Sequence, residues 1–366
     1  MGSRPPQLTV IIPTVNEADH LPGLLVDLHA QQKIRLEMVV GDGGSRDATV
    51  ALARTLGARV LKAPLGRGRQ MNRAAARARS PYLLFLHADS RLPDPFLLAP
   101  ALAALKAALN DSPDGAVAGH FPLRFQRTRQ DHAWTYRFME AKTHLNRVNT
   151  TNGDQGLLLS RTFFNQLGGF AESLPFLEDQ ELAEKIRRRG RWITLPGTLV
   201  TSARRFEAQG VSATYLLMSL IMGAYSTGLR PFFTRLPDVY RAVQRKGSEE
   251  GRLYLSPYFK ALRAMHRKDL PGWAKIRAWQ RIGGYIRSNI WQVFFYLDVR
   301  THPEREQSQH PWLDFYDRHL VRCLANPIVD AVLCLSCFLL VFGLIAPYYS
   351  IIESRQQKDD ARWFDA

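Results

Sequence analysis

An imidazole and a carboxylate stand two positions apart where an apolar run of the chain ends. His87 and Asp89 follow residues 82–86, whose composition predicts a buried strand. In an extended backbone, side chains two residues apart leave on the same face, so the pair could hold a divalent metal. Asp89 alone could hold Mg²⁺ or Mn²⁺ beside a diphosphate. An ordinary strand followed by a loop-capping aspartate explains the same residues equally well.

Other polar residues also follow predicted strands within the first ninety positions. Asn16 and Glu17 come after the first apolar run, and Asp42 comes after the second. The carboxyl ends of parallel strands meet at one sheet edge, so these groups are expected to converge with Asp89. The glycines at 41, 43 and 44 lack the dinucleotide-binding spacing, which disfavours NAD. Strands are predicted at 8–13, 36–40, 59–61 and 82–86, with helices between them, which indicates an α/β fold with a parallel sheet.

The next hundred residues add candidates with plainer explanations beside them. A strand is predicted over 116–125, a helix over 131–146 and a turn-rich loop over 150–156. A helix is expected from Glu178 to Arg189, and acids in a first turn are favoured by the helix dipole whether or not they have another role.

Five short motifs occur in order within residues 8–235. They are Val10-Ile11-Ile12-Pro13-Thr14-Val15-Asn16-Glu17, Asp42-Gly43-Gly44-Ser45-Arg46-Asp47-Ala48-Thr49, Phe85-Leu86-His87-Ala88-Asp89, Gly168-Gly169-Phe170 and Glu178-Asp179. In this order and spacing they resemble the family-2 glycosyltransferases of the GT-A fold, and the form Phe-Leu-His-Ala-Asp is similar to a small bacterial branch. The resemblance implies a nucleotide-diphospho-sugar transferase fold, with a mostly parallel central sheet flanked by helices, followed here by a helical C-terminal extension.

The resemblance implies donor-binding roles near the start of the chain. Pro13, Asn16 and Glu17 would line the base and ribose pocket, and Asp42 would hydrogen-bond the base, a uracil in many members. The basic loop of Gly66 and Arg67 would approach the nucleotide.

It also implies the catalytic and metal-binding residues. Asp89 matches the second acid of the family's Asp-x-Asp metal motif, and Asp179, next to Glu178, matches the general base. Arg205 is a candidate for stabilising the leaving group, although a solvated basic face explains Arg204 and Arg205 as well. Asp154 is a substrate-pocket candidate only.

Two positions depart from the family pattern. His87 replaces the first acid of Asp-x-Asp, and imidazole suits Mn²⁺ better than Mg²⁺. The alternative is that Asp89 binds the metal alone. Gly43 replaces the second acid of the usual Asp-Asp-Gly-Ser, so base recognition is expected to differ.

The charge of the chain concentrates after the first domain. The net charge is +16, and residues 241–287 hold twelve Lys or Arg against three Asp or Glu, among aromatic residues. Such a stretch suits an anionic membrane surface. It would equally suit nucleic acid, but no nucleic-acid-binding motif is visible, so none is expected as a partner.

Two uncharged runs occur after residue 210. Residues 211–229 are diluted by Ser, Thr and Gly and predict an interfacial or packed helix rather than a span. Residues 331–352 predict one C-terminal transmembrane helix in the inner (cell) membrane, with the basic side and catalytic domain facing the cytoplasm. A buried core or dimer helix is the alternative. The expected domains are 1–235 (glycosyltransferase), 236–326 (basic helical extension), 327–352 (transmembrane helix) and 353–366 (polar tail).

Together these features predict a membrane-attached, metal-dependent inverting glycosyltransferase. It would use a nucleotide-diphosphate sugar, with a UDP-sugar favoured, and a lipid-linked or membrane-proximal acceptor. Three other readings stay open: an inactive GT-A scaffold, a nucleotidyltransferase, and a basic nucleic-acid-binding membrane protein.

Overall fold

The computed structural model of the chain describes residues 4–174, 176–228, 253, 255–268, 272–301 and 309–354. The chain forms two compact units, the first comprising Met1–Arg127 and Ala133–Ala203, the second Thr128–His132 and Arg204–Ala366. The expected domain boundary at 235 and most of the expected polar tail, residues 355–366, lie outside the described residues.

A seven-stranded sheet forms the centre of the first unit, in the order β3-β2-β1-β4-β7-β5-β8. The first four strands along the chain are parallel, β7 runs antiparallel to both β4 and β5, and β8 is parallel to β5. The sheet is therefore mostly parallel, as predicted. The strands are β1 (Leu8–Thr14), β2 (Leu36–Asp42), β3 (Arg59–Lys62), β4 (Tyr82–Phe85), β5 (Val117–His120), β7 (Leu157–Ser160) and β8 (Arg191–Thr194).

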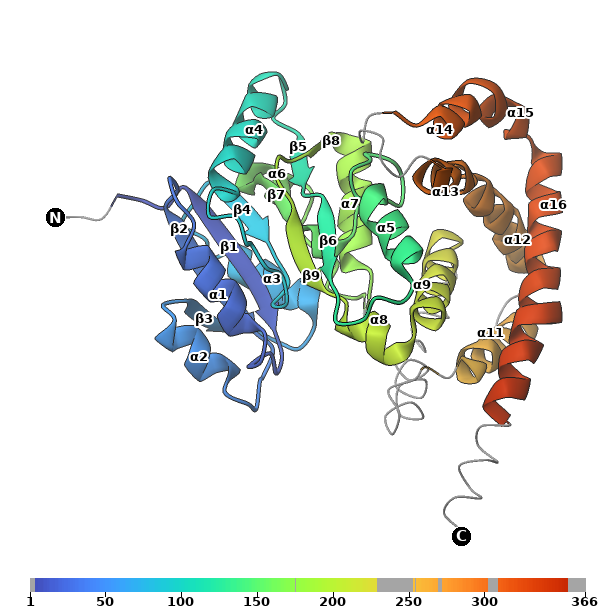
Figure 1. Cartoon of the computed structure of the whole chain (residues 1–366), viewed down its shortest axis with the longest axis horizontal. Helices are drawn as coiled ribbons and strands as arrows, with labels where there is room; N and C mark the ends of the chain where they lie inside the picture. Colours follow the sequence, from blue (N-terminus) through green and yellow to red (C-terminus); the bar gives the residue numbers. More distant parts are fainter. Residues whose placement is uncertain are drawn as a thin grey trace, which may run out of the picture. The chain divides into compact units, whose positions relative to one another are not determined.

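Helices cover both faces of this sheet (Figure 1). Successive strand residues point to opposite faces, so Val10 and Ile12 pack in one core while Ile11 packs in the other. This explains why β1 is mostly apolar: both of its faces are buried. One core contains α1 (Leu21–His29), α2 (Thr49–Thr55) and α4 (Leu98–Asn110); the other contains α3 (Arg67–Ala75), α6 (Arg161–Gln166) and α7 (Glu178–Arg189).

The single strand predicted over 116–125 was wrong, because Pro122 divides it. β5 ends at His120, and β6 (Leu123–Gln126) joins a separate two-stranded parallel sheet with β9 (Leu199–Ser202). Proline has no N–H for a strand ladder, and here its carbonyl accepts a hydrogen bond from the amide of Leu199. The next helix, α5 (Ala133–Lys142), is shorter than the predicted 131–146.

The second unit is helical in the residues that the structure describes. Its α9 (Val211–Ser226) is 16 residues long and buries one face at residues 211, 214, 217, 221 and 224, a one-sided pattern that fits a packed helix. The other helical segments are α8 (Arg204–Gln209), α11 (Ser256–Lys268), α12 (Gly272–Arg287), α13 (Trp291–Thr301), α14 (Pro311–Phe315), the π-helical η2 (Tyr316–Leu320), α15 (Val321–Leu324), α16 (Pro327–Phe338) and the π-helical η3 (Leu339–Ile345).

A continuous helix of 28 residues, Pro327–Ser354, contains α16 and η3. It is long and apolar enough to cross a membrane, and only 6% of its most apolar stretch is buried. Asp330 near its start pairs with Arg287 of α12 at 2.7 Å, and Glu353 near its end accepts hydrogen bonds from the amides of Leu255 and Ser256, where α11 begins. Both charged groups at the helix ends therefore have partners within the second unit.

Candidate active site

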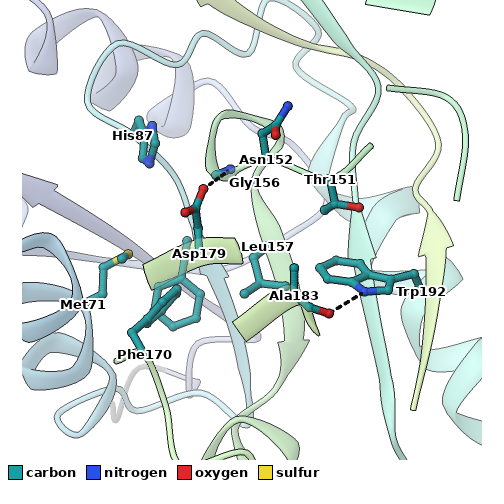
Figure 2. Close-up of a pocket in the computed structure, with 12 residues that line it drawn as sticks. Met71, His87, Thr151, Asn152, Gly156, Leu157, Phe170, Asp179, Ala183 and Trp192 are labelled. Carbon is teal, nitrogen blue, oxygen red and sulfur yellow. Dashed lines mark hydrogen bonds between the residues drawn. The ribbon is translucent and has the colours of Figure 1, made fainter. Parts of the chain in front are cut away.

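A pocket in the first unit brings together side chains from distant parts of the sequence (Figure 2). His87, Thr151, Asn152 and Asp179 supply its polar groups. The rest of the lining is mainly apolar, so the pocket combines a small cluster of polar side chains with an apolar surface. The remaining lining residues are Met71, Phe85, Gly153, Gly156, Leu157, Phe170, Ala183 and Trp192.

The carboxyl ends of β1 and β2 form a hydrogen-bonded pair of loops. The buried carboxylate of Asp42 accepts the amides of Gly44 at 3.0 Å and Ser45 at 3.2 Å. Asn16 has a φ of 55°, its amide donates to Ser45 Oγ at 2.9 Å, and its side-chain oxygen accepts the amide of Arg46. The contact of Pro13 and Asp42 with a base stays a prediction. Pro13 pairs with Gly41 in the sheet, one position before the Thr14 and Asp42 pair.

Gln70 ties these loops to α3, and the sequence analysis missed it. Its side chain is 2% exposed, and its amide nitrogen donates to the carbonyls of Thr14 at 2.7 Å and Gly41 at 2.9 Å. A Cβ on Gly43 would lie 2.9 Å from both Gln70 Nε2 and Val15 Cγ2. Close packing by Gln70 therefore explains why glycine occupies the position where the family carries a second acid.

Replacing Gly43 with alanine is expected to lower the free energy of unfolding by about 1–3 kcal/mol, because overpacking forces the Gln70 amide from its two carbonyls. The measurement is urea unfolding of the detergent-solubilised protein. Gly223→Ala is the control. Gly223 lies in α9, and a Cβ there would meet the Tyr285 side chain of α12 at 3.7 Å, an ordinary van der Waals distance. A Gly43→Ala protein as stable as the wild type would show that Gln70 does not enforce the glycine.

The predicted nucleotide-binding arginine is held by a predicted catalytic acid. Arg67 begins α3 after Gly66, whose φ is 128°, and its Nε lies 2.8 Å from Oε1 of Glu178. The Glu178 side chain is only 3% exposed, and burial raises its pKa even though Arg67 acts in the opposite direction. Burial opposes the charge on Arg67, but the carboxylates of Glu178, Asp179 and Asp154 outweigh it and raise its pKa. The pair therefore keeps a cation at the site.

Replacing Arg67 with methionine is expected to lower the free energy of unfolding near neutral pH by roughly 2 kcal/mol, because Glu178 loses its partner. The figure is below that of a fully buried pair, since the Arg67 side chain is 45% exposed.

The loss should shrink as the pH is lowered. An acid whose pKa is raised in the folded state stabilises the fold at low pH and loses this contribution as the pH rises, and removing Arg67 raises the pKa of Glu178 further. Urea unfolding of both proteins from neutral to acidic pH measures the difference in the free energy of unfolding. Arg188→Met, which breaks an exposed pair with Glu184, is the control. A loss in Arg67→Met that grows on acidification would contradict the assignment.

His87 and Asp179 are joined by the Gly-Asp-Gln-Gly loop. His87 Nδ1 lies 2.6 Å from Asp154 Oδ1, and the amide of Gly153 donates to Asp179 Oδ2 at 2.8 Å, which is the dashed line that ends at Asp179 in Figure 2. Burial opposes protonation of His87, but the hydrogen bond and charge of Asp154 prevail and raise its pKa. Asp179 Oδ1 accepts the amide of Gln180, so the carboxylate is oriented through both oxygens. The residue before the helix, Leu177, has a φ of 64°, a strained conformation of the kind that clusters at functional sites.

The predicted metal-binding acid lies close to this group. Asp89 is half-buried, and its charge raises the pKa of His87. Within the described part of the chain, its carboxylate forms no hydrogen bond or ion pair. The described residues contain no cluster of three His, Cys, Asp or Glu that could hold an ion by themselves. Mg²⁺ and Mn²⁺ commonly bind through one or two carboxylates together with substrate phosphates, and Asp89 fits that arrangement.

The structure thus gathers most of the predicted catalytic group in one place. Asp179, rather than its neighbour Glu178, lines the pocket, so Asp179 is the better placed of the two to meet a substrate. Arg205 lies on α8 in the second unit, and its role stays a prediction. Glu17 sits beside the loop of Asp47, with its amide donating to Thr49 Oγ1 at 2.8 Å.

Comparison with known proteins identifies the family of the N-terminal part of the chain. Residues 9–168 match the model of Glycosyl transferase family 2. This part of the chain is therefore a family-2 glycosyltransferase domain, and over residues 9–168 the resemblance predicted from the motifs is confirmed.

A curated relative is the 4,4'-diaponeurosporenoate glycosyltransferase of Staphylococcus haemolyticus, 34% identical over 99 residues. The match covers 25% of this chain and about a quarter, 26%, of the relative.

Solved structures show weaker likenesses. The mannosyltransferase PcManGT of Pyrobaculum calidifontis, in complex with GDP-Man and Mn²⁺, is 19% identical with a TM-score of 0.43, over 91% of this chain and 88% of that one. S. aureus TarS 1–349, in complex with UDP, is 14% identical with a TM-score of 0.42, over 77% and 71%. These values are too low to carry the activity of either protein over to this chain.

Proposed function

We propose that the protein is a metal-dependent inverting glycosyltransferase that takes a sugar from a nucleoside-diphosphate sugar, with a UDP-sugar favoured. The observation that carries the proposal is the arrangement of Asp179, His87 and Asp89 in a family-2 domain. A carboxylate lines a pocket on one side, and a half-buried carboxylate without a protein partner among the described residues lies beside the imidazole. A transfer reaction requires one such group at the acceptor and another at the diphosphate.

The residues fit a divalent cation bound together with substrate. Arg67 and His87 experience the charges of Asp89, Asp154, Glu178 and Asp179, so carboxylates outnumber the arginine at this site. Asp89, with His87 beside it, would hold Mn²⁺ or Mg²⁺. When bound, the ion supplies positive charge for the departing diphosphate.

The chain's own groups would then perform the transfer. Asp179 takes the proton of the acceptor hydroxyl, whose oxygen attacks the anomeric carbon on the side opposite the diphosphate. The bond between that carbon and the diphosphate oxygen breaks, and its electrons leave with the diphosphate. Arg67, kept charged by Glu178, adds a cation on the donor side, and Arg205 is proposed to assist the leaving group.

The acceptor proposed is lipid-linked or membrane-proximal. Support comes from the apolar lining next to Asp179 and from the helix Pro327–Ser354, which could cross a membrane. The curated relative is named for diaponeurosporenoate, which makes a lipid-like acceptor a reasonable class to test. Membrane attachment would place the basic side, and with it the catalytic domain, toward the cytoplasm.

A transfer assay tests this function. Purified protein is incubated with radiolabelled UDP-glucose, UDP-N-acetylglucosamine or GDP-mannose, Mn²⁺ and a bacterial lipid extract, and label is counted in the organic phase. Label from one donor, abolished by EDTA, is expected. Transfer that persists in EDTA would contradict metal dependence, and absence of transfer together with absence of nucleotide binding would favour the inactive scaffold.

A further inference from the structure

The short loop before β7 contacts both Asp179 and His87 of the candidate site. Gly153 donates its amide to Asp179, and the next residue, Asp154, places a carboxylate oxygen 2.6 Å from His87 Nδ1. A Cβ on Gly153 would lie 2.9 Å from Asp179 Oδ2 and 3.1 Å from His87 Nε2. Nε2 therefore faces the same small space as the Asp179 carboxylate, while Nδ1 faces Asp154.

A chain of hydrogen bonds centred on the buried residues Gln155 and His120 supports this loop. Gln155 is fully buried; its side-chain oxygen accepts the amide of Asn152 at 2.7 Å, and its nitrogen lies 3.0 Å from His120 Nδ1. His120 Nε2 lies 2.6 Å from Asn146 Oδ1. The Gln155 amide nitrogen donates to His120 Nδ1 and Asn146 Oδ1 accepts from His120 Nε2–H, while burial lowers the pKa of His120. Asp154 is thus attached to a rigid segment, although its own side chain is 46% exposed.

We propose that Asp154 is a positioning residue that orients His87 so that Nε2 can bind Mn²⁺ beside the donor diphosphate. An Nδ1–H bond to a carboxylate fixes the imidazole ring and its tautomer and leaves the lone pair on Nε2, the arrangement by which a carboxylate outside the ligand set tunes a metal-bound histidine. The proposal rests on the proposed function. It gives His87 a role in place of the missing first acid, and it gives Asp154 a role through His87.

The test measures Mn²⁺ binding rather than transfer. Free Mn²⁺ is followed by electron paramagnetic resonance during titration of the full chain with saturating UDP, for the wild type, Asp154→Ala, Asp154→Asn, His87→Gln and the double variant Asp154→Ala/His87→Gln. Loss of a carboxylate behind a metal-bound histidine typically weakens metal binding by about 10–100-fold, and we expect at least about tenfold in Asp154→Ala. Asp154→Asn, which keeps an oxygen acceptor, should recover part of the affinity.

Two further comparisons separate positioning from a general structural effect. In the His87→Gln background, Asp154→Ala should change Mn²⁺ affinity by less than about twofold, because it acts through the imidazole. Competition with Mg²⁺ should show a smaller preference for Mn²⁺ in Asp154→Ala than in the wild type, since imidazole is the ligand that favours Mn²⁺. Asp111→Asn, at an exposed position after α4, is the matched control and should bind as the wild type does.

Each outcome decides the proposal. Unchanged Mn²⁺ affinity in Asp154→Ala, or an equal loss in the presence and absence of His87, would overturn the positioning role while leaving the proposed function in place. A wild-type protein that binds neither Mn²⁺ nor UDP would overturn both.

Discussion

Replacing Asp179 with asparagine is expected to lower the rate of sugar transfer by about 10²–10⁴-fold, the usual contribution of a general base. Asparagine has nearly the same shape and keeps an oxygen that can accept the amide of Gly153, but it cannot take the acceptor proton. The measurement is the initial rate of transfer to the lipid extract at saturating donor. Binding of the nucleotide alone should be unchanged, because Asp179 acts on the acceptor.

Glu181→Gln is the matched control for this variant. Glu181 lies two residues further along α7, and its carboxylate pairs with Lys185 at 3.2 Å. Glu181 does not line the pocket, and exposed ion pairs of this kind contribute little energy. The transfer rate of Glu181→Gln is therefore expected to stay within about twofold of the wild type. An Asp179→Asn protein that transfers sugar as fast as Glu181→Gln would show that another group, or none, removes the proton.

Replacing Gly153 with alanine is expected to lower transfer by about a hundredfold, the effect that a misplacement of about 1 Å can have on a reacting geometry. The new methyl group would lie 2.9 Å from Asp179 Oδ2 and 3.1 Å from His87 Nε2, so both side chains must move. They can turn aside without unfolding the core, and the melting temperature should therefore change little. Both Mn²⁺–UDP affinity and transfer rate should fall, because one methyl group disturbs both ends of the site.

Gly23→Ala provides the comparison for this prediction. Gly23 lies on α1, which packs in the other core, and a Cβ there meets the guanidinium of Arg91 at 3.2 Å, a flexible group that can shift. Its transfer rate should match that of the wild type. If Gly153→Ala keeps wild-type transfer and Mn²⁺–UDP affinity, then Asp179 and His87 do not share the space that the structure gives them.

The sequence was a good guide to the sheet wherever local composition decides the structure. The β-branched run before Pro13 predicts a doubly buried strand, and β1 is buried at every residue. The same approach failed at residues 116–125, where composition favours a strand throughout but Pro122 ends the ladder and sends the chain into a second sheet. The helix expected from Glu178 to Arg189 has those bounds in the structure.

The candidate site could be predicted as a set of residues but not as a set of contacts. Arg67 and Glu178 are 111 positions apart, and His87 and Asp154 are 67 apart, so neither pair follows from local spacing. Gln70 carried no motif; its role follows from burial under two backbone carbonyls, which only the fold supplies. The fold also explains why Gly43 departs from the family pattern, because Gln70 packs too closely for a larger side chain.

The central claim is that the first unit binds a nucleotide diphosphate through a divalent ion held at Asp89. Calorimetric titration of UDP, GDP and dTDP into the detergent-solubilised full chain, with and without Mn²⁺, tests it most directly, on the wild type and on Asp89→Asn. We expect Mn²⁺-dependent binding of one nucleotide, UDP before the others, and loss of that binding in Asp89→Asn. Binding that needs no metal, or that survives in Asp89→Asn, would contradict the metal site, and absence of binding for every nucleotide would contradict the glycosyltransferase function itself.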